Sequence, residues 1–264
     1  MDFIQIFLRL GLVIQVFMLL VWLCSLALKD SSIVDIFWGP GFVLTNWVAF
    51  GLTPEGYFAR KSLLSVLVTI WGLRLGLHIL VRNLGKPEDF RYQAMRIEGG
   101  KTWWWISYFK VFVLQGFLMW LISAPLLAAQ IHSEPQHLTW IDAGAVVIWV
   151  IGFFFEAAGD WQLMHFKADP SNKGRVLNTG VWRYTRHPNY FGDAVQWWGF
   201  YFLAVSAGGW FTLFSPMLMT GLLLRVSGVT LLEKTLKATK PEYQRYINST
   251  SPFLPWFPKE RRVR

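Results

Sequence analysis

Ionisable and amide side chains occur inside stretches of this sequence that are otherwise apolar. Glu156 and Asp160 are four residues apart, and Asn189 and Asp193 repeat that spacing, which places each pair on one face of a helix. A charge at the centre of a bilayer costs at least about 2.5–3.5 kcal/mol. We therefore expect these faces to turn toward one another or toward a watery cavity and to serve a function. The simpler alternative is that the polar contacts only hold helices together. Further pairs at helical spacing are Arg74 with His78, Asn189 with Gln196, and Arg225 with Glu233.

The segment that leads into Asn189, KADPSNKGRVLNTGVWRYTRHPNY at 167–190, is rich in cations, hydroxyl groups and aromatic rings. Guanidinium groups suit phosphate, and the free amides of a helix that starts after Pro188 favour an anion. The flat rings of Tyr184 and Tyr190 suit an aromatic base. We expect a pocket for a nucleotide-like cofactor. The cations expected to meet its phosphates are Lys173, Arg175, Arg183 and Arg186. A basic loop that touches anionic lipid headgroups is the alternative, but it leaves the deeper polar residues unexplained.

Several other chemistries lack the motifs that they require. No GxGxxG motif follows a strand pattern and no Walker A lysine motif occurs, so helices and loops must hold any nucleotide. Cys24 is the only cysteine, which excludes an intrachain disulfide and a cysteine metal cluster. His132 and His137 share a polar loop, and we interpret them as solvated side chains. We expect no metal site.

The elements that must position the polar residues are membrane helices. The chain of 264 residues is 54% hydrophobic and 16% charged, whereas soluble domains carry about 25% charged residues. Runs long enough to cross a bilayer predict an all-α, polytopic membrane protein with about seven spans around a cytoplasm-facing cavity. The expected spans are 3–28, 33–51, 62–81, 103–129, 140–166, 190–207 and 210–232. Because no long linker occurs, we expect one transmembrane domain over 1–264.

The distribution of Lys and Arg predicts the orientation of these spans. Twenty of the 25 basic residues fall in loops and a tail on one side, and only Arg60 and Lys61 fall in a loop on the other. Basic loops stay in the cytoplasm, so we expect the N-terminus outside and the C-terminus inside. The net charge of +9 then reflects topology, and nucleic acid is not an expected partner.

Three blocks of sequence carry a resemblance to a known family. LNTGVWRYTRHPNYFGDAVQWWG, LLRVSGVTLLEK and PEYQRYINSTSPFLPWFP occur in this order, and VDIFWGPGF and GKPEDFRYQAMR precede them. Together they resemble the steroid 5-alpha-reductase-like membrane proteins, and within them the bacterial branch. The resemblance runs from about Ser32 to Pro258, with a reductase-like core at about 140–258. It implies NADPH on the cytoplasmic side, a lipid-like enone entering from the bilayer, and a location in a bacterial inner membrane.

The resemblance also implies roles for individual residues. Asn189 and Asp193 match an asparagine and an acidic cofactor contact, Asp160 matches an aspartate of the fifth helix, and Arg225 matches an arginine of the last span. Lys86 stands where the family has a basic loop residue. The complete expected cofactor-binding set is Lys86, Asp160, Lys173, Arg175, Arg183, Tyr184, Arg186, His187, Asn189, Tyr190, Asp193, Arg225 and Glu233.

The sequence departs from the family where the substrate carbonyl is polarised. The characterised reductases use a glutamate of the second helix and a tyrosine of the third. Here the second helix offers Asp35 and the third offers Trp71, whose indole cannot act as an acid. His78, two turns further, could donate the proton instead. We therefore expect Asp35 and His78 to be the catalytic residues.

Two other functions stay open at this stage. The isoprenylcysteine carboxyl methyltransferases share the RHPxY signature and carry a glutamate like Glu233 and an arginine like Arg225 in the last helix, which favours S-adenosylmethionine as the cofactor. A lipid-binding protein without turnover is the third possibility. The sequence names neither the substrate nor the oligomeric state.

Overall fold

A computed structural model describes residues 2–226, 229, 233, 236–237, 240 and 242–259. These residues are largely helical and contain no β-strand, apart from one isolated bridge between Thr185 and Ser251. Five helical segments within them are long and apolar enough to cross a membrane. They are Phe3–Leu28, Ile33–Leu52, Phe58–Asn83, Phe90–Ile131 and Trp140–Ala168. The expectation of an all-α polytopic membrane protein is confirmed, whereas the count of seven spans stays a prediction.

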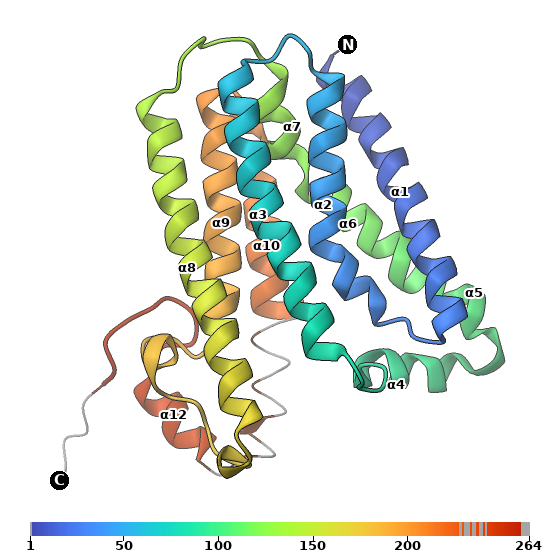
Figure 1. The fold of residues 1–264 in the computed structure, drawn as a ribbon, viewed down its shortest axis with the longest axis vertical. Coiled ribbons are helices and arrows are strands. Elements are labelled where there is room, and N and C mark those ends of the chain that lie inside the picture. Colours follow the sequence, from blue (N-terminus) through green and yellow to red (C-terminus); the bar gives the residue numbers. More distant parts are fainter. Residues whose placement is uncertain are drawn as a thin grey trace. The chain divides into compact units, whose positions relative to one another are not determined.

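The chain forms two compact units. The first comprises Met1–Asp142 and Leu203–Ser215, and the second comprises Ala143–Phe202 and Pro216–Arg264. That the whole chain forms one transmembrane domain stays a prediction. The helices of the first unit are α1 (Phe3–Leu28), α2 (Ile33–Leu52), α3 (Phe58–Asn83), α4 (Phe90–Gly99), α5 (Trp103–Ser107), α6 (Leu114–Ile122) and α7 (Ala124–Ile131) (Figure 1).

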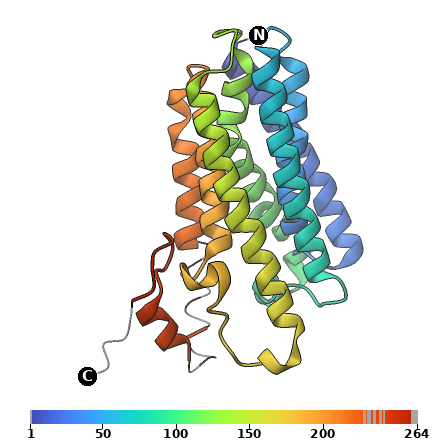
Figure 2. The same cartoon turned by 60° about the vertical axis from the view of Figure 1, so that its left-hand side comes forward.

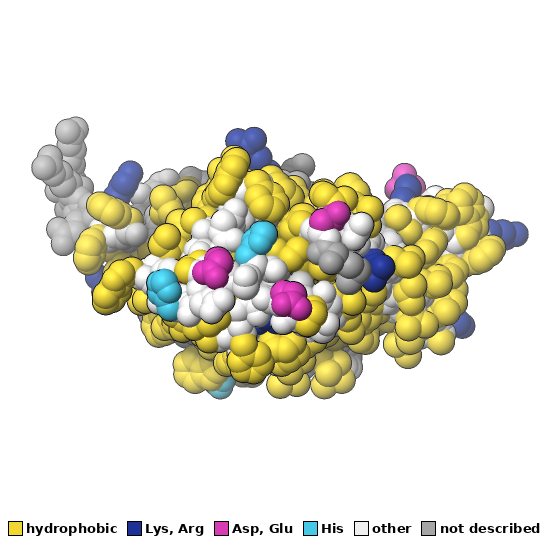
Figure 3. Space-filling view, turned by 90° about the horizontal axis from the view of Figure 1, so that it is seen from above, with side chains coloured by type: hydrophobic (Ala, Val, Ile, Leu, Met, Phe, Trp, Pro, Cys, Tyr) yellow, Lys and Arg dark blue, Asp and Glu magenta, His cyan; other side chains and the backbone are white. Residues whose placement is uncertain are grey.

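Helix α1 shows how one helix serves both lipid and protein. Asp2 starts it by accepting a hydrogen bond from the Gln5 amide at 2.8 Å. One face is buried and includes Ile6, Leu10, Ile14 and Met18. The other face exposes Ile4, Leu8, Leu12, Val16 and Leu20. An exposed apolar face of this length suits contact with acyl chains, and hydrophobic side chains cover much of the surface seen end-on in Figure 3.

Helices α2 and α3 lie side by side (Figures 1 and 2) because glycines let their backbones approach closely. A Cβ added to Gly39 would lie 2.3 Å from the Gly72 carbonyl oxygen, and one added to Gly76 would lie 2.9 Å from Pro40. Gly72 and Gly76 form a GxxxG spacing, which is typical of tight helix contacts in membranes. The contact fixes the α2 turn that carries Asp35 beside the last turns of α3.

The two cations predicted for the sparsely charged loop are internal. Arg60 is fully buried, and its Nε donates to Asp142 Oδ1 at 3.0 Å. Lys61 is 3% exposed and donates to the carbonyl oxygens of Phe50 and Thr53 at the end of α2. A cation at a helix C-terminus satisfies the carbonyls that have no partner within the helix.

The second unit is organised around a long helix. The second unit contains all but the first residues of α8 (Trp140–Ala168), most of α9 (Pro188–Ser206) and of α10 (Phe214–Gly221), and α12 (Tyr243–Ser249). Pro188 is the first residue of α9, a position that needs no backbone N–H. A Cβ on Gly152 of α8 would lie 2.6 Å from the Gly192 carbonyl oxygen of α9, so these helices also touch through glycine.

Candidate functional site

The polar stripes of α8 and α9 meet inside the second unit, as their spacing predicts. Asn189 Nδ2 donates to Asp160 Oδ1 at 3.0 Å, and Gln196 Nε2 donates to Glu156 Oε2 at 2.6 Å. Both carboxyl groups are buried, at 7% and 2% exposed, respectively. Asp193, between the two α9 amides, is buried as well. The contact between α8 and α9 is therefore a row of buried polar pairs, which we call the polar ladder. Its Asp160–Asn189 pair lies at the first turn of α9.

Residues directly before α9 form a second polar cluster around Glu233. Arg186 donates to Glu233 Oε1 through Nε at 2.8 Å and through Nη2 at 2.7 Å, and His187 Nε2 lies 3.3 Å from the same oxygen. Arg186 and His187 are 6% and 3% exposed. Burial would raise the pKa of the Glu233 carboxyl, but the hydrogen bonds from His187 and Arg186 outweigh it and hold the pKa below its usual value.

Arg186 also binds the last turn of α12 and the residue that follows it. Its Nη1 donates to the carbonyl oxygens of Ile247, at 3.1 Å, and Thr250. Three further bonds repeat the pattern. They join the Arg186 amide to Ser251 O at 2.9 Å, Thr185 Oγ1 to Phe253 O at 2.8 Å, and the Trp256 amide to Tyr184 O at 2.9 Å. We call residues 182–187 and 246–256, joined in this way, the C-terminal clasp.

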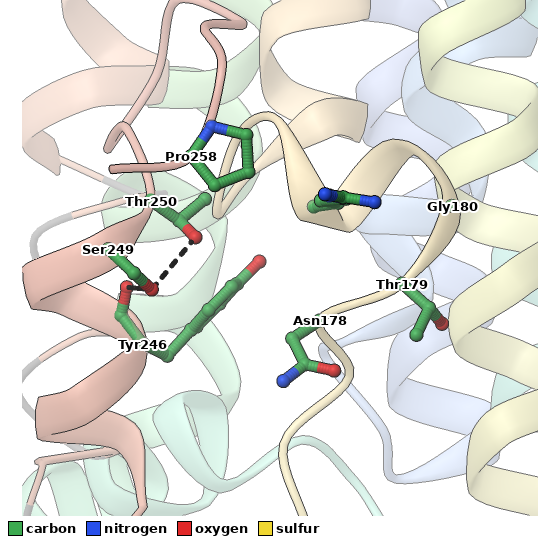
Figure 4. A pocket seen from close by; sticks show the side chains of 8 residues that line it. Asn178, Thr179, Gly180, Tyr246, Ser249, Thr250 and Pro258 are labelled. Atoms are coloured by element: carbon green, nitrogen blue, oxygen red, sulfur yellow. Dashed lines mark hydrogen bonds between the residues drawn. The ribbon is translucent and has the colours of Figure 1, made fainter. Parts of the chain in front are cut away.

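A pocket of about 350 Å³ opens beside the clasp (Figure 4). Its lining includes Asn178, Thr179, Arg183, Tyr246, Ser249 and Thr250. The Tyr246 hydroxyl donates to the Trp182 carbonyl oxygen, which ties α12 to the opposite wall. Arg183, Lys173 and Arg175 all have exposed side chains on the segment that connects α8 to α9. The pocket therefore lies in a basic, hydroxyl-rich part of the second unit.

The remaining expected cofactor residues are spread more widely. Tyr190 stacks on His187 with ring centroids 5.7 Å apart, and the exposed Tyr184 packs edge-on against Phe257. Arg225 is exposed in the π-helical turn Leu222–Val226. Lys86 belongs to the first unit, in the loop after α3, where its Nζ donates to the Arg82 carbonyl oxygen.

The first unit holds a different cluster, centred on Asp35. The Tyr92 hydroxyl donates to Asp35 Oδ1 at 2.7 Å, and Arg91 Nη2 donates to Asp35 Oδ2 at 2.8 Å. Gln115 Nε2 donates to the Tyr92 hydroxyl oxygen at 3.1 Å. Tyr92 is 5% exposed. The arrangement is a carboxylate–phenol pair that contacts one guanidinium, which Asp35 shares with Asp89.

Sequence reasoning missed Tyr92 and Gln115. It left residues 82–102 as the connection between two expected spans, whereas residues 90–99 form α4, which starts after the capping residue Asp89. The DFRY stretch at 89–92 was the available signal, because it brings an arginine and a tyrosine onto the first turn of a short helix. Trp71, where the family has its tyrosine, is fully buried and packs on Phe42 at 5.7 Å between ring centroids. His78 is half-buried on α3.

The Asp89 end of α4 is braced by a second acidic residue. Glu88 accepts hydrogen bonds from Arg96, at 2.8 Å to each carboxyl oxygen, and from the Ser31 amide at 2.6 Å. Burial would raise the pKa of the Glu88 carboxyl, but these bonds outweigh it and lower the pKa. Glu88 thus joins the α1–α2 connection to α4 and holds α4 where Tyr92 reaches Asp35.

Comparisons with known proteins identify a family and two relatives for this chain. Residues 21–250 match the family described as "Protein of unknown function (DUF1295)". The chain is 25% identical over 262 residues to "Uncharacterized protein C594.04c" of Schizosaccharomyces pombe, covering 89% of this chain and 75% of the relative. It is 26% identical over 119 residues to bovine (Bos taurus) 3-oxo-5-alpha-steroid 4-dehydrogenase 1, covering 43% of this chain and 44% of that enzyme. No solved structure matches the chain. The protein belongs to the DUF1295 family, which is related to the steroid 5-alpha-reductases.

Proposed function

We propose that this protein is an NADPH-dependent membrane reductase that acts on a conjugated carbon–carbon double bond in a steroid-like or isoprenoid lipid. The observation that carries the proposal is the buried polar ladder of α8 and α9, which ends at Asp160 and Asn189 beside a basic, hydroxyl-rich segment. The similarity to a bovine steroid dehydrogenase supports the same reaction class. Reduction of a lipid also suits a protein whose helices expose apolar faces.

The side chains of the second unit fit a phosphorylated dinucleotide. NADPH, when bound, supplies the hydride. The exposed cations Lys173, Arg175 and Arg183 suit its phosphates, and the Asn189 amide suits a carboxamide or a ribose hydroxyl. Arg186 is already engaged with Glu233 and two carbonyl oxygens. The proposal therefore gives Arg186 the task of positioning the clasp rather than that of meeting a phosphate.

The first unit offers the acid that such a reduction requires. Addition of hydride to the β-carbon of an enone places negative charge on the carbonyl oxygen, which a hydrogen-bond donor stabilises. The proposal assigns this task to the Tyr92 hydroxyl, oriented by Asp35 and Gln115. Arg91, which also pairs with Asp89, donates to the other Asp35 oxygen and so helps to fix the carboxyl that orients the phenol. His78 is the alternative donor on α3.

Cofactor binding tests the proposal directly. Purified protein in detergent is titrated with NADPH while the nicotinamide fluorescence is followed, and Asn189→Ala and Asp160→Asn are compared with the exposed control Gln244→Ala. We expect saturation with the unchanged chain and the control, and affinity about 10-fold or more lower in both site variants, because Asn189→Ala removes the amide that would contact the cofactor and Asp160→Asn removes the carboxylate that orients this amide. Absence of saturation at millimolar NADPH contradicts the proposal. Saturable heat with S-adenosylmethionine instead would identify a methyltransferase.

A further inference from the structure

The pocket beside the clasp has a defined chemistry of its own. Figure 4 shows Tyr246, Ser249, Thr250 and Pro258 on one side and Asn178 and Thr179 on the other. Arg183 is the charged group in its lining, and none of the described lining residues is acidic. Hydroxyl and amide donors around one guanidinium match an anion with several acceptor oxygens, such as a phosphate.

The two arginines of the RYTRH stretch differ in what remains available to a ligand. Arg186 is 6% exposed and all three of its nitrogens donate to protein acceptors. Arg183 is exposed, and within the described part of the chain its side chain has no ion pair. The sequence alone places both in one basic run, whereas the structure separates a structural arginine from one that faces the pocket.

The walls of the pocket are held in place before any ligand arrives. The Val181 amide donates to Gln162 Oε1 at 3.1 Å, and Trp182 Nε1 donates to the Gly159 carbonyl oxygen at 3.1 Å, so the wall that carries Arg183 is fixed to α8. The clasp fixes the opposite wall through Tyr246 and Arg186. A preorganised site loses little conformational entropy on binding.

From these observations we infer that this pocket binds the 2′-phosphate of NADPH and is the determinant that distinguishes NADPH from NADH. The inference rests on the proposed function. A volume of about 350 Å³ is at the lower end for small-molecule sites, which suits a phosphorylated ribose rather than a whole dinucleotide. Arg183 provides the paired N–H donors for the phosphate, and Asn178 and Thr179 provide an amide and a hydroxyl donor. The phosphate of a lipid headgroup is the other source of the same chemistry.

Parallel titrations with NADPH and NADH test the inference. Arg183→Gln removes the pocket cation, and Arg245→Gln removes an exposed cation of α12 that does not line the pocket. We expect Arg183→Gln to weaken NADPH binding about 10- to 100-fold, as loss of a charge-assisted hydrogen-bonded pair should. NADH affinity should change less than about 2-fold, because its ribose lacks the phosphate that Arg183 would meet. Arg245→Gln should alter neither affinity.

Each other outcome has a distinct meaning. If Arg183→Gln weakens NADPH and NADH equally, or leaves NADPH unchanged, the pocket does not read the 2′-phosphate, while the proposed reductase function stands. If phosphatidic acid in the detergent competes with NADPH and Arg183→Gln abolishes that competition without changing the preference for NADPH, the pocket holds a lipid phosphate and the inference is overturned. If the unchanged chain binds neither nucleotide, the proposed function fails first.

Discussion

At the scale of single residues, the chemistry depends on which polar groups are engaged by the protein and which are left for a ligand. Helical spacing sufficed to predict that Asp160 and Asn189 would face each other, because both lie on long regular helices. Spacing could not predict that Tyr92 binds Asp35, since 57 residues separate them and the contact depends on how α4 packs. Spacing also could not separate the roles of Arg183 and Arg186, because the partners of Arg186 at 233, 247 and 250 are distant in sequence.

Replacement of Arg186 should affect stability far more than replacement of Arg183. Arg186→Gln leaves the Glu233 carboxylate with His187 alone and removes the guanidinium from two carbonyl oxygens, and loss of one partner of a buried ion pair typically costs about 3–5 kcal/mol. Arg183→Gln removes an exposed cation and should shift stability by less than about 0.5 kcal/mol. Thermal unfolding in detergent, followed by tryptophan fluorescence, measures both. Equal melting temperatures for the two variants would show that the clasp contributes nothing.

The lowered pKa of Glu233 predicts a specific loss of stability in acid. The folded-state pKa lies below the ordinary value of 4.5, so the stabilisation from the ionised carboxyl is complete above about pH 4.5 and is lost as the pH falls through the folded-state pKa. Glu233→Gln should therefore be less stable at pH 7 and respond less to acid between about pH 5 and pH 3. The control Glu242→Gln, at an exposed turn, should keep the full response. If the melting temperatures of Glu233→Gln and of the unchanged chain fell by the same amount between pH 5 and pH 3, this account would be refuted.

At the scale of helices, long apolar runs are predictable and the interruptions within them are not. The expected spans 3–28 and 33–51 agree with α1 and α2 to within one residue. The expected span 103–129 lies within the candidate membrane span Phe90–Ile131, in which the structure distinguishes α5, a π-helical turn at Tyr108–Val113, α6 and α7. Side-chain hydropathy sets the length of an apolar run, whereas packing against neighbours decides where its backbone turns. The short polar helix α4 carries no transmembrane signal and was therefore missed.

The close contact of α2 and α3 predicts a sharp difference between two glycines of the same helix. A Cβ on Gly39 would lie 2.3 Å from a backbone oxygen of α3, so Gly39→Ala must push the helices apart at a cost of about 1–3 kcal/mol. Gly51, also in α2, has nothing within 4 Å of an added Cβ, and Gly51→Ala should be neutral or slightly stabilising. The melting temperatures of Gly39→Ala and Gly51→Ala in detergent, each compared with that of the unchanged chain, test this difference. Equal tolerance at both positions would contradict the described helix contact.

At the scale of the whole molecule, the exposed Lys and Arg residues are distributed between the two expected sides of the membrane even more unequally than their count in the sequence suggests. Arg60 and Lys61, the two cations that stood against the predicted orientation, are buried; Asp142 pairs with Arg60, and carbonyl oxygens at the end of α2 accept from Lys61. Neither cation of the α2–α3 region is therefore exposed at the surface. The five long apolar helices require a membrane, and the remaining basic residues predict which side faces the cytoplasm.

Labelling of introduced cysteines tests this orientation. Because Cys24 is the only cysteine, Cys24→Ser gives a background without thiols. Glu55→Cys and Ser171→Cys then place one thiol on each of two exposed loops. We expect a membrane-impermeant maleimide to label Glu55→Cys in intact cells and Ser171→Cys only after permeabilisation. The reverse pattern would invert the orientation.

The central claim is that hydride passes from NADPH to a lipid double bond, and deuterium transfer measures it most directly. Membranes that contain the protein are incubated with NADPH deuterated at C4 and a total lipid extract, with Tyr92→Phe membranes as the control. Mass spectrometry should find a lipid species that gains one deuterium and one solvent hydrogen, and its yield should fall at least about 10-fold in the control because the proposed acid is lost. Consumption of NADPH without any deuterated lipid would contradict the account. So would a yield of deuterated lipid that is the same in membranes with the unchanged protein, with Tyr92→Phe and without the protein.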